Sequence, residues 1–88
     1  MKKAIITVVG KDTVGIIAKV CVYLAENNVN ILDISQTIVD GYFNMMMVAD
    51  VTNVAFDQIC DGIAKVGEEL GVMIHCQRED IFDKMHRI

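Results

Sequence analysis

The chain has 88 residues, enough for one domain that buries roughly two-thirds of the surface its unfolded form exposes. Its formal net charge of −4 argues against a nucleic-acid binder, which needs a basic face opposite the phosphates. Hydrophobic residues make up 53% of the chain, and the mean hydropathy is +0.41. So small a domain has too much surface to hide all of these side chains, and we therefore expect a face for self-association.

No apolar run approaches the roughly 20 residues that a membrane-spanning helix needs. The N-terminal Met-Lys-Lys resembles the start of a signal peptide. However, Thr7 and Gly10 interrupt the apolar run behind it, and no small-residue cleavage site follows. The sequence therefore predicts a cytoplasmic protein with no membrane partner.

Residues 3–9 open the chain with β-branched side chains that are apolar on both faces, and they predict a central strand. From about residue 14, apolar side chains recur every three or four positions, which indicates an amphipathic helix. Asp12 or Thr13 is expected to cap the start of this helix. Its apolar stripe consists of Ile16, Ile17, Val20, Cys21 and Leu24.

The dipeptide Asn27-Asn28 is expected to end this helix, since Asn tolerates the left-handed conformation. Residues 30–39 predict a second strand. Asp40-Gly41 behind it is a strong hairpin signal, because a type I′ turn needs positive φ at both central positions. In this strand we expect two faces: on one side Leu32, Ile34 and Ile38, on the other Asp33, Ser35 and Thr37.

Residues 42–51 predict the returning strand. Thr52 or Asn53 is then expected to cap a second helix over residues 54–70, which Gly71 ends. The apolar face of the strand is expected to carry Phe43, Met45, Met47, Ala49 and Val51, and that of the helix Phe56, Ile59, Cys60, Ile63, Val66 and Leu70.

Residues 72–77 predict a fourth strand, and Ile81, Phe82 and Met85 a short C-terminal helix. With right-handed crossovers, the order βαββαβ predicts an α+β, ferredoxin-like fold: a four-stranded antiparallel sheet with two helices on one face. Residues 1–88 are expected to form a single domain. Because the helices cover only one face of the sheet, we expect a second copy of the chain to cover the other and form a homodimer.

The chain offers little for catalysis. Cys21, Cys60 and Cys76 are odd in number and widely spaced, which favours buried free thiols over a metal or redox role. His75 and His86 are expected to be structural or solvated. No nucleophile, base and orienting group can be assembled from local motifs. We therefore predict that the protein is not an enzyme and uses no metal or cofactor.

The loop before the first helix is the candidate site. Residues 10–15 have the pattern Gly-x-Asp-x-x-Gly, and the helix behind them begins with N–H groups that attract carboxylates. Asp12 adds a negative charge, so a zwitterion suits this loop better than an inorganic anion. The alternative is a purely structural loop, in which Gly10 and Gly15 serve the turn and Asp12 caps the helix.

Three stretches together resemble the ACT domain family. They are Val-Val-Gly-Lys-Asp-Thr-Val-Gly-Ile-Ile-Ala at residues 8–18, Asn-Val-Asn-Ile-Leu-Asp-Ile-Ser-Gln at 28–36, and Gly-Tyr-Phe-Asn-Met at 41–45. The whole chain is most similar to small stand-alone ACT proteins of bacteria and archaea, related to the glycine cleavage system transcriptional repressor. One departure is Val14, where the family commonly has proline.

The resemblance implies a regulatory fold that binds an amino acid or related metabolite. It also implies dimers that pair the first helix and second strand or join sheets, with a further regulatory protein as a candidate partner. The alternative is a constitutive dimeric interaction module without a ligand. By position, the implied ligand-binding residues are Asp12, Val14, Gly15 and Ile16 in the loop, with Asn30, Ile31 and Asp33 on the opposing segment.

Overall fold

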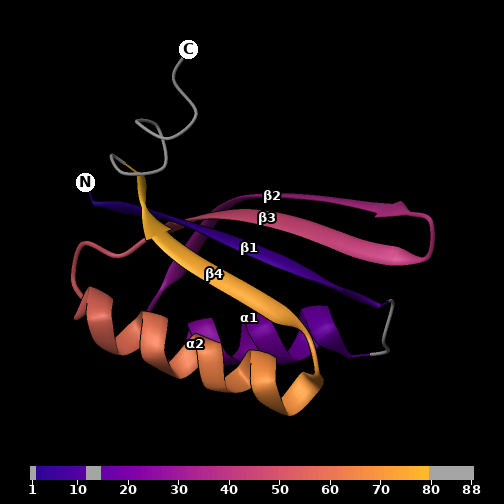
Figure 1. The fold of residues 1–88 in the computed structure, drawn as a ribbon. Coiled ribbons are helices and arrows are strands. Elements are labelled where there is room, and N and C mark those ends of the chain that lie inside the picture. The colour runs from indigo at the N-terminus through magenta and orange to yellow at the C-terminus, as the bar shows by residue number, and fades with distance from the viewer. Residues whose placement is uncertain (1, 12–14, 80–88) are drawn as a thin grey trace.

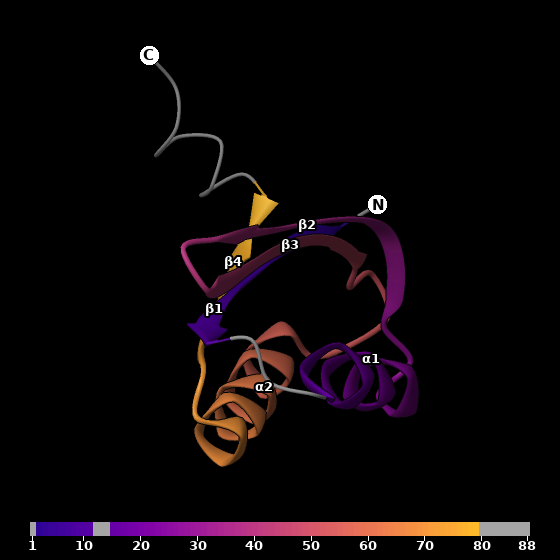
Figure 2. The ribbon, with the colours of Figure 1, turned by 90° about the vertical axis from the view of Figure 1, so that its right-hand side faces the viewer.

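The computed structural model describes residues 2–11 and 15–79. Its strands form one antiparallel sheet in the order β2-β3-β1-β4, and both helices cover the same face of it (Figures 1 and 2). This is the predicted ferredoxin-like α+β fold, and the first strand is central as predicted. The predicted C-terminal helix lies outside the described residues. The elements are β1 (Lys3–Lys11), α1 (Ile16–Glu26), β2 (Asn30–Val39), β3 (Tyr42–Asp50), α2 (Phe56–Leu70) and β4 (Met73–Arg78).

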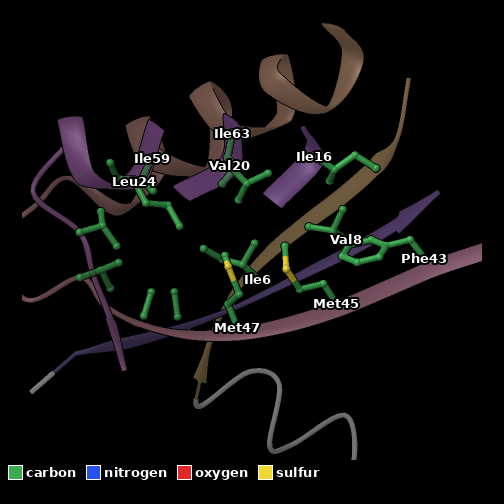
Figure 3. Close-up of a cluster of buried hydrophobic side chains, with 14 residues drawn as sticks. Ile6, Val8, Ile16, Val20, Leu24, Phe43, Met45, Met47, Ile59 and Ile63 are labelled. Carbon is green, nitrogen blue, oxygen red and sulfur yellow. The ribbon is translucent and has the colours of Figure 1, made fainter. Parts of the chain in front are cut away.

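The core fills the layer between the sheet and the helices (Figure 3). Period-two alternation sends every second side chain of β1 and β3 into this layer, where Ile6 pairs with Met47 and Val8 with Met45. The helices meet them with residues spaced by four. The buried helical side chains are Ile16, Val20 and Leu24 of α1 and Ile59 and Ile63 of α2.

The predicted turns are confirmed. Asp40 and Gly41 have φ angles of 53° and 81°, the pair of positive values that a type I′ hairpin requires. Asn28, just beyond α1, has a φ of 61°, and Gly71 ends α2 with a φ of 71°. Asp, Gly and Asn all tolerate the left-handed region better than β-branched residues do.

The predicted N-cap residues of both helices are wrong. The N-cap of α1 is Gly15, and that of α2 is Ala55, which makes no side-chain cap hydrogen bond. The Thr52 hydroxyl instead donates to the Asp50 carboxylate at 2.5 Å and accepts from the N–H of Lys2 at 2.9 Å. Because Thr52 closes the end of β3 onto the start of the chain, it is not available to α2.

Strand β2 contains a bulge. Its register with β3 shifts between Ile31 and Asp33, which places Leu32 out of the pairing. Beyond the bulge, Ile34 pairs with Met47 and therefore lies on the helix side of the sheet, as does Ile38 through its pairing with Phe43. The predicted alternation holds from residue 33 onward. It fails at Leu32.

Candidate functional site

The start of α1 is built around Gly15. Gly15 has a φ of 93°, in the left-handed region where a side chain is strained, and its carbonyl accepts the Lys19 N–H at 2.9 Å to open the helix. As a glycine N-cap it offers no side-chain oxygen to the N–H groups behind it. The first turn of α1 also has no acidic residue. This end of the helix therefore suits a carboxylate supplied from outside. Asp12 and Val14 lie outside the described residues.

Ile16 does not contact a ligand through its side chain. Only 2% of it is exposed, since it packs in the core, so its contribution to a site is its main-chain N–H. The neighbouring Ile17, at 37% exposed, lies at the surface instead. It lines a groove of about 460 Å³ together with Phe43 and residues 36–38 of the β2–β3 hairpin. The sequence predicted that Ile17 belongs to the buried stripe of the helix. Its position at the border of that stripe was the signal that it could lie at the surface.

The remaining predicted site residues lie in β2, with Asn30 at the far end of the sheet and Asp33 between that end and the groove beside Ile17. Lys11, the last residue of β1, pairs with Tyr42, which pairs with Val39 at the end of β2. Asn30, the first residue of β2, pairs instead with Asp50, which pairs with Lys3. Nine residue steps of strand separate the ends of β2, about 30 Å at ~3.3 Å per residue. One chain therefore does not bring Asn30 to the start of α1. Asp33 lies nearer, three residues or about 10 Å along β2 from Gln36 in the groove beside Ile17.

Asn30, Ile31 and Asp33 differ in what they present. Asn30 and Asp33 are exposed, and the Asp33 carboxylate accepts the Ile34 N–H at 2.9 Å beside the bulge. Ile31 is half-buried and packs against the core. Only the two polar residues therefore offer accessible groups, of which Asp33 is the one that can neutralise an ammonium group.

Strand β2 is also an edge strand, paired on one side only by β3. Apolar side chains line this edge: Ile34 is 43% exposed, Ile38 is 62% exposed, and Ile17 of α1 adds to them. Long apolar edges are templates for pairing with another strand, and proteins usually protect them with charges or proline. Here Asp33 is the one charged residue between Asn30 and Val39.

The part of the chain that the structure describes contains no group of three or more His, Cys, Asp or Glu placed to hold a metal ion. No described helix is long and apolar enough to cross a membrane. The three thiols are free, as predicted, but each is only partly buried. Burial raises the pKa of Cys76, Cys60 and Tyr23, and these groups lie away from the start of α1, between the helices and β4.

A family model described as the ACT domain matches residues 2–77. The chain belongs to the ACT domain family. A UPF0237 protein of Bifidobacterium longum is 62% identical, and one of Methanocaldococcus jannaschii is 50% identical; each alignment covers 100% of both chains. ACT domains are regulatory ligand-binding modules, and the stand-alone type predicted from the sequence is confirmed.

Solved structures agree with this assignment. An ACT domain protein from Streptococcus pneumoniae has a TM-score of 0.83 and 44% identity, covering 93% of this chain and 94% of that one. A putative glycine cleavage system transcriptional repressor has a TM-score of 0.80 at 19% identity, covering 88% of this chain and 45% of that one. At that identity the likeness concerns the fold alone.

Proposed function

We propose that this ACT domain is a cytoplasmic regulatory protein, not an enzyme, and that it binds an amino acid or related metabolite between two copies of the chain. One observation carries the proposal: Asn30 lies at the far end of β2 from the groove beside Ile17, and Asp33 stands about 10 Å along the strand from that groove. A site that needs both Asn30 and the start of α1 is incomplete in a single chain. A second copy supplies the missing half.

The geometry of that second copy follows from the β2 edge. Two identical strands related by a two-fold axis run antiparallel, so the start of one β2 lies beside the end of the other. The Asn30–Asp33 segment of one copy then lies near the Gly15 helix start of its partner. The apolar side chains of Ile17, Ile34 and Ile38 become buried, and the free main-chain groups of β2 become paired. We prefer this arrangement to sheet-on-sheet packing for that reason.

The open face of the sheet supports the same preference. Val9, Tyr42 and Met46 are exposed there, as are Val39 and Met73 through their pairing with Tyr42 and Val9. Thr7 and Asn44, however, lie among these apolar side chains. Burying the hydroxyl and amide without partners would oppose the gain from the apolar side chains. The β2 edge imposes no such penalty, because strand pairing satisfies the groups that it buries.

The chemical class of the ligand follows from the charges at the two parts of the site, the start of α1 and Asp33. The N-terminus of α1 presents main-chain N–H groups without an acidic neighbour in the first turn, and it suits a carboxylate. Asp33 presents an exposed carboxylate for an ammonium group. The groove beside Ile17, about 460 Å³, is within the size range of small-molecule sites and offers apolar walls for a side chain. A zwitterionic amino acid matches all three features.

A ligand mechanism follows from linkage. A ligand that contacts both copies binds the paired arrangement better than the separate chains and so increases its population. The test is a thermal melt of the protein with each common amino acid at millimolar concentration, followed by calorimetry on any that raise the melting temperature. At 100 times the dissociation constant, stabilisation is about 2.7 kcal/mol. Absence of both a shift and a binding signal across the set contradicts the proposal.

The rival function, a constitutive interaction module, makes a different prediction. A module of that kind captures its protein partner whether or not the loop can admit a ligand. Gly15→Trp fills the approach to the α1 start, so a partner retained equally by wild type and this variant favours the rival. Loss of ligand-dependent capture in the variant favours ligand sensing.

A further inference from the structure

Two of the three cysteines, Cys60 and Cys76, meet where α2 packs against β4. The Cys60 Sγ donates a hydrogen bond of 3.4 Å to the main-chain carbonyl oxygen of Cys76. The register explains the meeting: Cys76 pairs with Ile6 and therefore points toward the helices, while Cys60 follows Ile59 on the buried side of α2.

We propose that Cys60 and Cys76 are a redox modification site, which forms an intramolecular disulfide on exposure to a low-molecular-weight disulfide such as oxidised glutathione. The bond joins the second turn of α2 to β4. It does not depend on the proposed ligand or on a second copy of the chain.

The movement that the bond requires is small. Disulfides need Cβ atoms about 3.5–4.5 Å apart and a particular dihedral angle. The Cys60 sulfur already reaches the main chain of Cys76, and the Cys76 side chain points toward the same side of the sheet, so the two sulfurs are expected to meet through side-chain rotation without a change in the fold. Cys21 is no competitor, because it lies four residues after Ile17 and so shares the side of α1 that faces the β2 groove.

The exchange proceeds in two steps. The Cys60 thiol loses its proton to solvent, and its thiolate attacks oxidised glutathione, forming a mixed disulfide and releasing one glutathione thiolate. The Cys76 thiolate, deprotonated in turn, attacks the Cys60 sulfur and displaces the second glutathione. The protein gives up two protons and two electrons. One disulfide is reduced to two thiols, and one new S–S bond forms.

The surroundings of the two thiols decide which one reacts first and how the rate depends on pH. Burial raises the pKa of both thiols, and the effect is stronger at Cys76. The pKa of Cys60 is also lowered by a hydrogen bond with the Cys76 thiol and raised by the charges of Asp57 and Asp61. Cys60 is therefore the first nucleophile. Neither thiolate is stabilised by its site, so the thiolate fraction of both cysteines is small at neutral pH. The high pKa makes the reaction slow at neutral pH and faster at mildly alkaline pH.

The test uses Cys21→Ser, which leaves only the two thiols of interest. Folded protein is incubated with oxidised glutathione at mildly alkaline pH, quenched with acid, and mapped by mass spectrometry of peptides. We expect loss of both thiols, a mass lower by two hydrogens, a peptide that joins Cys60 to Cys76, and a monomer on a non-reducing denaturing gel. The oxidised form should also melt at a higher temperature than the reduced form.

The matched control is Cys21→Ser with Cys76→Ser, in which the reaction should stop at a glutathione adduct on Cys60. Three results would overturn the proposal. They are stable glutathione adducts on both thiols of Cys21→Ser, two thiols that stay free in the folded protein, and a disulfide that forms only after denaturant has unfolded the chain.

Discussion

Tyr23 of α1 donates a hydrogen bond of 3.3 Å from its hydroxyl to the main-chain carbonyl oxygen of Ile59 in α2. The ring can come this close because Gly62, three residues further along α2, has no side chain. A Cβ at that position would overlap both the hydroxyl and the ring of Tyr23. The hydrogen bond links α1, whose first turn is part of the candidate ligand site, to the turn of α2 that carries Cys60.

Gly62→Ala should therefore destabilise the protein although alanine is the better helix former. Overpacking a tight contact costs about 1–3 kcal/mol, against a helix-propensity gain of about 1 kcal/mol. Denaturant unfolding measures the difference. In a Tyr23→Ala background the overlap is gone, so the same Gly62→Ala change should become stabilising by up to about 1 kcal/mol. Destabilisation of equal size in both backgrounds would contradict this account.

The shared ligand site predicts complementation between two defective chains. Gly15→Trp and Asp33→Asn should each abolish ligand binding as homodimers. When the two variants are mixed and allowed to exchange, half of the dimers formed at random contain both. Each such dimer has one site with both defects and one intact site. Calorimetry should then recover binding. A site within one chain gives no recovery, because every chain in the mixture carries a defect.

Ile34→Asp should convert the proposed dimer to a monomer. The change places a charge on the apolar β2 edge, where pairing with a second strand would bury it without a partner. Sedimentation or light scattering measures the mass. The matched control is Val22→Asp, since Val22 is also exposed, at 54%, but lines a groove between α1 and α2. A dimer that survives Ile34→Asp and dissociates with Val22→Asp would place the interface on the helices instead.

Asp50 should contribute to the loss of stability in acid. The Thr52 hydroxyl, and then the Thr52 N–H at 2.9 Å, hold the pKa of Asp50 below its ordinary value of 3.8. Because the folded-state pKa lies below the unfolded one, the contribution is present at neutral pH and is lost as pH falls through the folded value. Asp50→Asn should therefore lower the unfolding free energy at neutral pH, with a difference from wild type that shrinks in acid. In a Thr52→Val background the effect should be smaller.

Much of the fold could be predicted because its signals are local. Period-two alternation in β1 and β3, period-four spacing in the helices and the Asp40-Gly41 turn each depend on residues that are neighbours along the chain. The bounds of β2 agree with the prediction at both ends. Caps were less predictable, because Thr52 is a good cap by type, yet Asp50 and Lys2 occupy its hydroxyl.

The sequence by itself determined the family, the order of elements and the residue types at the α1 start, because these follow from local pattern and motif spacing. Only the tertiary structure decided that Ile16 is buried while Ile17 is exposed, and that Asn30 lies at the far end of β2 from the groove beside Ile17. It also decided that Cys60 meets Cys76. The reason is physical: a strand's pairing and a helix's rotation depend on contacts between segments far apart in the chain, and no local pattern encodes those distances.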